Sequence, residues 1–279
     1  MGDLRDKVTA LRCNSWAELT EAFEELSYVT NGGKTNHWIY RGEADAGWWL
    51  QPSIERFRES LAAAECPYSI RELERQLLYD FQSSAAQFLD NLPSVHETLE
   101  WLAVLQHYGT PTRLLDWTYS PTVAAYVALR EKLAAGKEAC VWALNLRKLR
   151  KLVIKRSRKR NWDTAYKAAI RQVEQDKRPA FITPFLPQNR YSRMSSQQGL
   201  FLVKTVAESP FMATLDDMCP LNDRDFIRRL LIPHSERVRI LGHLIEHNTH
   251  EVGIFPDADG FGRFVRIKVE VQAQTLGLF

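Results

Sequence analysis

The chain has 279 residues, of which 45% are hydrophobic and 25% charged, and its formal net charge is +3. This length and composition support a large hydrophobic core and exclude an intrinsically disordered chain. Such a small net charge argues against a protein devoted to coating nucleic acid. Four scattered cysteines without a C-x-x-C pair indicate neither a zinc ribbon nor a disulfide framework. The charged N-terminus has no apolar signal segment and no run of about 18 apolar residues occurs, so we expect a cytoplasmic protein without a membrane span.

Capping residues, glycines and prolines divide the chain into helices and strands. The predicted elements are, in order, a helix from Ser15 to about Tyr28, a strand over 37–42, a helix from Ser69 to about Phe88, a helix opened by a capping box at 94–97 and ended by Gly109, a helix over 121–135, a strand over 139–144, a helix over 161–176, a loop over 181–188, a strand over 199–203, a helix over 236–247 and a strand over 264–271. This order predicts one α+β domain over residues 1–279, with a mixed or antiparallel central sheet flanked by helices.

The stretch 106–118 concentrates polar chemistry between two well-delimited helices. It holds three ionisable groups, two aromatic rings and three hydroxyls in an apolar frame. A structured loop and short strand between helices can aim side chains without disturbing the packing, so this density indicates a site. The alternative is a buried polar bracket that only ties elements together.

The first predicted strand ends in an arginine. With a period of two, His37, Ile39 and Arg41 share one face, and Gly42 lets a ligand or a neighbouring strand approach the backbone. The arginine needs an anion, which is either a ligand or the carboxylate of Asp116. We therefore expect Arg41 and Asp116 to lie on adjacent elements, and a separation beyond about 12 Å, far outside hydrogen-bond reach, would rule out one shared site.

Two other segments carry weaker signals. The segment 147–160 holds nine Lys or Arg and no acidic residue, which is typical of a solvated helix or excursion but also fits contact with nucleic-acid phosphates. His243 and His247 have the spacing of inverted zinc peptidases and share a helix face. A third ligand at the usual distance is missing, so we interpret them as surface or helix-terminal histidines and predict no metal site.

Several motifs in a fixed order resemble the FRG domain, named for its Phe/Tyr-Arg-Gly motif. They are Tyr40-Arg41-Gly42, Leu50-Gln51-Pro52-Ser53-Ile54, Gln106-His107-Tyr108-Gly109, Pro111-Thr112-Arg113-Leu114-Leu115-Asp116-Trp117-Thr118, Arg193 with Gln197, Gly199 and Phe201, and Ile254-Phe255-Pro256-Asp257-Ala258-Asp259-Gly260. The resemblance extends from about residue 20 to 265. It departs from the family pattern at Ala258, where the family usually has Leu.

The motif order is in turn similar to the Arg, Ser-Thr-Ser, Glu layout of ADP-ribosyltransferases. This resemblance implies that Arg41 holds the pyrophosphate of NAD, a contact that suits its planar fork. It implies that Asp116 and Thr118 orient the nicotinamide ribose and that His107 and Tyr108 line the nicotinamide pocket. Gln197 stands where the catalytic Glu normally does, and an amide cannot act as a carboxylate.

The resemblance thus implies an ADP-ribosyltransferase or NAD glycohydrolase in a bacterial toxin or antiviral defence setting. NAD or another nucleotide would be a substrate rather than a permanent cofactor, with an unidentified macromolecular acceptor. The implied catalytic residues are Asp116, Gln197 and His107, and the implied substrate-binding residues are Arg41, Gly42, Tyr108, Thr112, Arg113, Trp117, Thr118 and Arg193.

Two other classes of function remain open. One is a non-catalytic module that senses a small ligand, or nucleic acid with the help of 147–160. The other is a structural interaction domain whose polar motifs only brace the core. A cleft that exposes Arg41 and Asp116 favours an enzyme or a sensor, whereas a sealed ion pair favours the structural domain.

Overall fold

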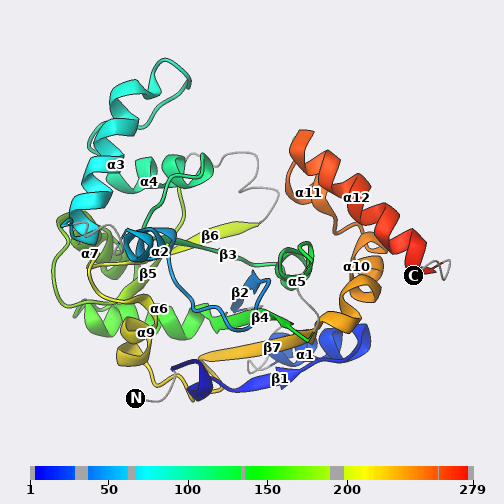
Figure 1. The fold of residues 1–279 in the computed structure, drawn as a ribbon. Coiled ribbons are helices and arrows are strands. Elements are labelled where there is room, and N and C mark those ends of the chain that lie inside the picture. The colour runs from blue at the N-terminus through cyan, green and yellow to red at the C-terminus, as the bar shows by residue number, and fades with distance from the viewer. Residues whose placement is uncertain are drawn as a thin grey trace.

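A computed structural model describes residues 4–28, 37–61, 67–132, 136–188, 198–256 and 258–275. Its centre is a seven-stranded sheet in the order β1-β7-β4-β2-β3-β6-β5 (Figure 1). The strands are β1 (Ala10–Arg12), β2 (Trp38–Glu43), β3 (Leu114–Thr118), β4 (Glu138–Asn145), β5 (Ile182–Phe185), β6 (Gly199–Lys204) and β7 (Ile227–Pro233). The β1–β7 pair is parallel and the other pairs are antiparallel. The predicted α+β class with a mixed central sheet is confirmed.

Helices cover both faces of the sheet. The helices are α1 (Trp16–Tyr28), α2 (Ser53–Ser60), α3 (Ile70–Ala85), α4 (Thr98–His107), α5 (Pro121–Leu129), α6 (Leu146–Arg156), α7 (Trp162–Gln175), α9 (Phe211–Met218), α10 (Arg237–Glu246), α11 (Glu251–Ile254) and α12 (Ala258–Thr275), with 3-10 turns at Leu4–Lys7 and His234–Glu236. Helices α1, α5 and α10 share one core cluster with Trp38 and Tyr40 of β2, and α6 and α9 share another with Ile39. The period-two alternation of the first strand therefore divides its side chains between two cores.

Helix α5 lies directly against β2, and Gly42 makes this close approach possible. A Cβ built on Gly42 would stand 2.6 Å from the backbone nitrogen of Ala128 and closer still to the backbone oxygen of Ala124. The sequence predicted that Gly42 admits a ligand or a neighbouring strand, but the partner that approaches it is a helix backbone.

The sheet opens between β2 and β3. These strands are in register at a single pair, Tyr40 with Thr118, whereas β2 pairs with β4 along its whole length. Beyond this pair the two strands separate. The backbone oxygen of Asp116 on β3 therefore accepts its hydrogen bond from the side chain of Arg41 on β2. Asp116 and Arg41 lie at this opening, on adjacent strands as the sequence predicted.

Two predicted elements are of another type in the structure. The alternating segment 264–271 was predicted as a strand, but it belongs to helix α12. Its spacing also suits a helix, because Ile267 and Val271 lie one turn apart and pack against the α1, α5 and α10 core, while Val265 and Val269 are exposed. The predicted loop over 181–188 contains β5, an edge strand, where a proline is tolerated within a strand.

The first turn of α4 also differs from the prediction. The backbone N–H of Ser94 donates to the carboxylate of Glu97, as in a capping box, but these residues form a separate turn and the helix begins at Thr98. The next helix, predicted to run to Ala135, ends at Leu129. There the buried guanidinium of Arg237 donates to the carbonyl oxygens of Leu129, Arg130 and Glu131. These carbonyl groups at the end of α5 thereby gain hydrogen-bond partners.

Among the described helices, none combines the length and the apolar character required to cross a bilayer.

Candidate functional site

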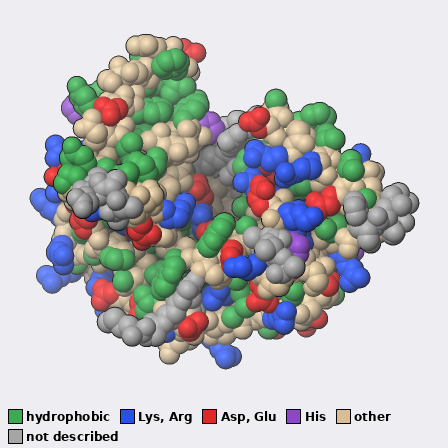
Figure 2. Space-filling model, viewed as in Figure 1, with side chains coloured by type: hydrophobic (Ala, Val, Ile, Leu, Met, Phe, Trp, Pro, Cys, Tyr) green, Lys and Arg blue, Asp and Glu red, His purple; other side chains and the backbone are tan. Residues whose placement is uncertain are grey.

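A cavity of about 320 Å³ lies between α4 and α5, above the place where β2 and β3 separate. Residues of α4, α5, β2, β3 and β6 line it, together with Phe255 after α11. On the face shown in Figure 2 the molecule is hollowed between the lobe of α3 and α4 and the lobe of α11 and α12. The described residues thus form a cleft at the position where the sequence predicted a site.

Arg41 lies in the opening between β2 and β3, and part of its guanidinium group forms hydrogen bonds within the protein. Its Nε donates to Glu43 at 2.7 Å, and its Nη1 donates to the backbone oxygen of Asp116 at 2.9 Å. Burial alone would lower the pKa of Arg41, but the charges of Glu43 and Asp116 raise it, so the side chain stays cationic. Three of the five guanidinium N–H groups make no hydrogen bond with the described residues.

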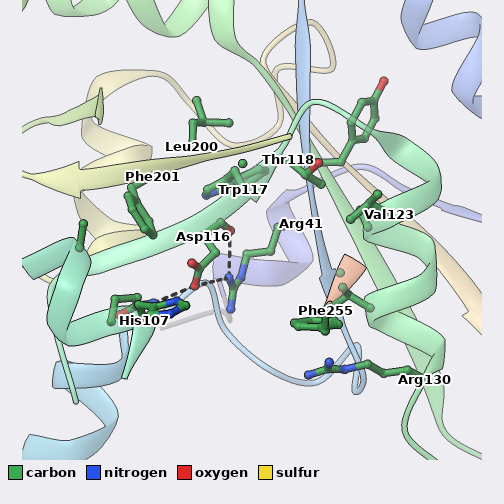
Figure 3. Close-up of a pocket in the computed structure, with 17 residues that line it drawn as sticks. Arg41, His107, Asp116, Trp117, Thr118, Val123, Arg130, Leu200, Phe201 and Phe255 are labelled. Carbon is green, nitrogen blue, oxygen red and sulfur yellow. Dashed lines mark hydrogen bonds and ion pairs between the residues drawn. The ribbon is translucent and has the colours of Figure 1, made fainter. Parts of the chain in front are cut away.

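Asp116 presents its carboxylate to the same cavity (Figure 3). Its Oδ2 accepts a hydrogen bond from Nε2 of Gln106 at 2.7 Å and lies 3.8 Å from Nη1 of Arg41. The amide of Gln106 is in turn fixed by the hydroxyl of Thr112, which donates to its Oε1 at 2.6 Å. The side chain of Asp116 is 54% exposed, against 16% for Arg41. The pair is therefore an open ion pair in a cleft rather than a sealed one.

The remaining walls are largely apolar and aromatic. Phe201 is the register partner of Asp116 on β6, and Val123 and Val127 contribute one face of α5. Phe255 closes the far side, and the guanidinium of Arg130 lies 4.6 Å from its ring centroid (Figure 3). A few polar groups set in apolar walls are typical of small-molecule sites.

A buried carboxylate ties this far wall to helix α12. Oε1 of Glu251 lies 3.2 Å from Nη1 of Arg130 and 3.1 Å from Nε of Arg263, and the side chain of Glu251 is fully buried. Burial raises the pKa of Glu251 above its ordinary value, although the two arginines oppose the shift. The contacts hold Phe255, four residues later, against the cavity.

The raised pKa of Glu251 predicts a pH dependence of stability. A carboxyl group whose pKa is higher in the folded state stabilises that state fully below its unfolded pKa, and the contribution is lost as the pH rises through the folded pKa. We therefore expect Glu251→Gln, which cannot ionise, to gain stability relative to the wild type as the pH rises through this window. Urea unfolding of both proteins at several pH values measures the difference. A difference that does not change with pH would contradict the assignment.

The structure places the predicted site residues in three groups. Those that line the cavity are Arg41, Gly42, His107, Asp116, Trp117 and Thr118. Those that do not line it are Tyr108, Thr112 and Arg113. Arg193 and Gln197 lie outside the described residues. Tyr108 is half exposed and packs its ring against Phe81, 6.2 Å away between centroids.

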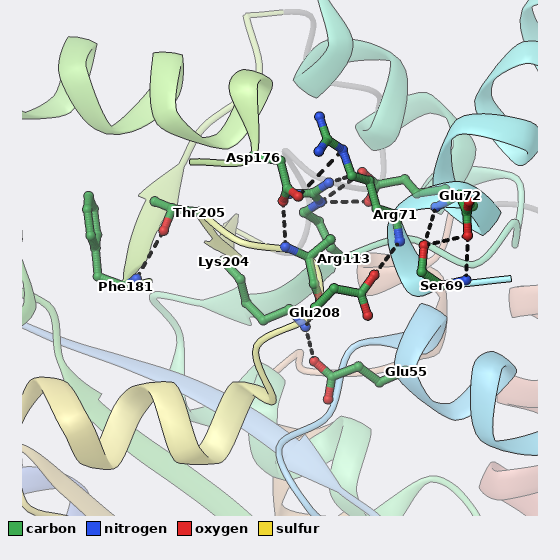
Figure 4. Close-up of polar contacts among 12 residues, drawn as sticks. Glu55, Ser69, Arg71, Glu72, Arg113, Asp176, Phe181, Lys204, Thr205 and Glu208 are labelled. Carbon is green, nitrogen blue, oxygen red and sulfur yellow. Dashed lines mark hydrogen bonds and ion pairs between the residues drawn. The ribbon is translucent and has the colours of Figure 1, made fainter. Parts of the chain in front are cut away.

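Arg113 belongs to a buried charge network rather than to the cavity (Figure 4). Its Nε donates to both carboxylate oxygens of Glu74 at 2.8 Å, its Nη2 also bonds Glu74, and its Nη1 donates to Asp176 at 3.2 Å. Asp176 also accepts from the backbone N–H of Ala207. The network joins α3, β3, the end of α7 and the loop after β6. In this setting the Arg113 side chain braces the fold behind the site.

Other candidate chemistries find little geometric support in the described residues. Burial raises the pKa of the Cys140 thiol to about 12 and those of Cys13 and Cys219 to about 11, which makes them poor nucleophiles. His243 stacks on Trp16 with ring centroids 5.7 Å apart. No cluster of three or more metal-ligating side chains occurs in the part of the chain that is described.

Several groups that line the cavity or contact its residues were not predicted as site residues. Gln106 belongs to a quoted motif, so its position next to Asp116 could have been suspected from the sequence. Glu43 is one strand period beyond Arg41 and shares its face, which was a usable signal. Arg130 and Phe255 come together only through the packing of α5 against α10, α11 and α12, and no local pattern reports this contact.

A family model, described as FRG domain, matches residues 36–137. No curated protein and no solved structure matches the chain. The matched region runs from β2 through α5 and includes Arg41, His107, Asp116 and Arg130. The later motifs, around Phe201 and Phe255, lie outside the match although both residues line the cavity. The chain therefore contains an FRG domain, located by the family model at residues 36–137.

Proposed function

We propose that the cavity binds a phosphate-bearing nucleotide, with NAD as the leading candidate, and that the protein cleaves or transfers at the nicotinamide ribosyl bond. One observation supports the proposal: Arg41, with three N–H groups that make no hydrogen bond with the described residues, and the exposed carboxylate of Asp116 face one cavity with aromatic walls. Guanidinium groups bind phosphate through charge-assisted hydrogen bonds, and Phe201 and Phe255 offer faces for planar rings.

The chemistry requires little from the protein beyond orientation and charge. When the bond between C1′ of the ribose and the nicotinamide nitrogen breaks, its electron pair leaves with the nicotinamide and an oxocarbenium-like cation forms. The carboxylate of Asp116 would stabilise that cation. A water or an acceptor hydroxyl then adds to C1′ and loses its proton, for which His107 at the cavity wall is the candidate acceptor.

A second candidate function is ligand sensing without turnover. It is favoured by the contacts of the Asp116 carboxylate, which accepts a hydrogen bond from Gln106 and pairs with Arg41. In such a module the ligand would bind at Arg41 and no nicotinamide would be released. Turnover measured alongside binding separates the two candidates.

A test of the role of Arg41 requires variants that still fold. Arg41→Ala would leave the buried Glu43 without its partner, and removing one member of a buried pair is strongly destabilising. Arg41→Lys keeps the charge but not the planar fork. We expect it to weaken NAD binding roughly tenfold, the loss of about one charge-assisted hydrogen bond of 1.5 kcal/mol.

Calorimetric titration with NAD measures this effect, with Arg12→Lys as the matched control. Arg12 lies on the edge strand β1, is exposed and forms an ion pair with Glu138 of β4. We expect the control to bind as the wild type does. The double variant Arg41→Met with Glu43→Met removes both charges together and should also lose binding while it remains folded. Unchanged affinity in both Arg41 variants would contradict the phosphate contact.

Asp116→Asn tests the chemical role of the carboxylate. The side chain is exposed and an amide fits the same space, so we expect the fold and NAD binding to persist. Turnover should fall at least tenfold, about 1.4 kcal/mol of lost transition-state stabilisation. Released nicotinamide, measured with and without cell extract as a source of acceptors, reports both hydrolysis and transfer. Equal turnover in Asp116→Asn would exclude Asp116 as the stabilising group.

The proposed setting is a bacterial toxin or an antiviral defence system, in which cleavage of NAD would halt growth. We expect induced expression of the wild type to lower cellular NAD and stop growth, and Asp116→Asn at equal protein level to do neither. Growth arrest that is identical in both strains would separate the toxicity from this chemistry.

A further inference from the structure

The segment 147–160 forms most of α6 and the turn after it, and it divides into two faces. Leu149 and Val153 are fully buried against the sheet. The exposed face carries only cations: Arg147, Arg150, Lys151, Lys155, Arg158, Lys159 and Arg160. We call these seven residues the basic face. The sequence predicted a solvated helix or excursion, and the structure has a helix with an exposed charged side and a buried apolar side.

The described part of the protein does not neutralise the basic face. Of the nine cations in the segment, Lys148 pairs with Asp223 and Arg156 with Asp217. The seven exposed ones make no ion pair with the described residues. The segment has a charge of +9 in a chain whose total is +3, so the remainder of the chain has −6. The positive charge is concentrated at one place.

This arrangement opposes the stability of its own helix. Arg147, Lys151 and Lys155 follow each other at intervals of four residues, and like charges at this spacing are destabilising by about 0.2–0.5 kcal/mol per pair. Arg147 also lies in the first turn, where the helix dipole disfavours a cation. These charges destabilise their helix, and ion pairs with the described residues do not offset this cost. Such a pattern indicates a function for the charges.

The spacing suits a phosphate backbone. The three residues form a row with steps of about 6 Å along the helix, given a rise of 1.5 Å per residue. Next to this row, Arg150 lies 5.1 Å from the ring centroid of Trp162, which in turn packs against Tyr166 at 5.5 Å. Both rings are partly exposed. Cations beside aromatic rings are the combination that binds nucleic acid without sequence preference.

We propose that the basic face binds nucleic acid through its phosphates. An anionic membrane is the other polyanion to consider, but interfacial helices insert an exposed apolar face, and the apolar face of α6 is buried in the core. No large apolar side chain of this segment is among the exposed ones in the described chain. No residue of α6 or of the turn after it is among the residues that line the cavity, so this surface is separate from the cavity.

The test uses the full chain and a fluorescent 20-nucleotide strand, as RNA and as DNA, with anisotropy as the readout. The test variant carries Arg147→Gln, Arg150→Gln, Lys151→Gln and Lys155→Gln. The control variant loses the same charge from exposed cations after α5 and on α10 and α12, with Lys132→Gln, Arg239→Gln, Arg266→Gln and Lys268→Gln. We expect the wild type and the control to bind alike, with affinity that falls as salt rises.

For the test variant we expect affinity reduced by roughly tenfold or more. The salt dependence should become shallower by about 0.7 in log–log slope for each phosphate that the protein no longer neutralises. Its NAD binding should match the wild type, so this proposal and the proposed function of the cavity fail independently. A melting temperature at or above that of the wild type is expected, because repulsion is relieved.

Protection of lysines in the wild type provides a measurement that does not depend on a variant. Bound strand should shield Lys151 and Lys155 from acetylation and leave Lys268 reactive, as read by mass spectrometry. Absence of binding, equal binding by both quadruple variants, or protection only by vesicles that contain phosphatidylserine would each overturn the proposal.

Discussion

Gly42→Ala is expected to destabilise the protein by about 3 kcal/mol or more, although it adds a single methyl group. The added Cβ would meet backbone atoms of Ala124 and Ala128, which cannot rotate away as a side chain would. Overpacking of a core usually costs about 1–3 kcal/mol, and this case lies at the upper end because helix α5 must move as a unit. The loss is a large share of the 5–15 kcal/mol that is typical of a domain.

Gly262→Ala is the matched control for this substitution. Gly262 lies in helix α12, and a Cβ there meets nothing within 4 Å. Alanine favours the helix, so we expect a gain of roughly 0.5–1 kcal/mol. Urea unfolding followed by circular dichroism measures both changes. A loss below about 1 kcal/mol for Gly42→Ala would mean that α5 is not seated on β2 as described.

Arg113→Met is expected to cost about 3–5 kcal/mol, because it leaves the buried carboxylate of Glu74 without its bidentate partner. Asp176 is less affected, since it keeps the backbone N–H of Ala207 and an ion pair with Arg71 at 3.5 Å. The double variant Arg113→Met with Glu74→Met should regain most of the loss, because two apolar side chains can replace a buried pair.

The control for Arg113 is Arg12→Met, which breaks the exposed pair with Glu138 and should change the free energy of unfolding by less than about 1 kcal/mol. The coupling between Arg113 and Glu74 follows from the single and double variants. Additive losses in the double variant would show that the two side chains do not act as a pair.

Local signals predicted much of the fold. The helix predicted to begin at Ser69 does so, with a capping box of Ser69 and Glu72, and Ser120 caps α5 ahead of Pro121. Gly109 has a φ of 81°, the left-handed conformation expected of a residue that ends a helix. Each of these features depends on residues within a few positions of one another, so one sequence suffices to read it.

Features that depend on distant contacts were not predictable in the same way. The segment 264–271 has a pattern that both a strand and a helix satisfy, and only its packing against α10 decides between them. Strands β1 and β7 were not predicted. Ala10–Arg12 is short and exposed and gains its order from pairing with a strand about 220 residues later. Buried partners such as Glu74 for Arg113 follow from tertiary structure alone.

The candidate site shows the same division. The proximity of Arg41 and Asp116 was predicted because an arginine at the end of a strand needs an anion. In the structure Nη1 of Arg41 lies 3.8 Å from Oδ2 of Asp116. The prediction that Arg113 and Thr112 bind substrate followed from their place in the motif. In the structure their side chains contact Gln106 and Glu74 and do not line the cavity, so their binding of substrate stays a prediction.

The most direct test of the account is a crystal structure of the Asp116→Asn protein with NAD, since reduced turnover should keep the ligand intact. We expect NAD in the cavity between α4 and α5, with its pyrophosphate on the guanidinium of Arg41 and a ring against Phe255 or Phe201. An empty cavity at a saturating NAD concentration established by calorimetry, or NAD bound elsewhere on the protein, would contradict it.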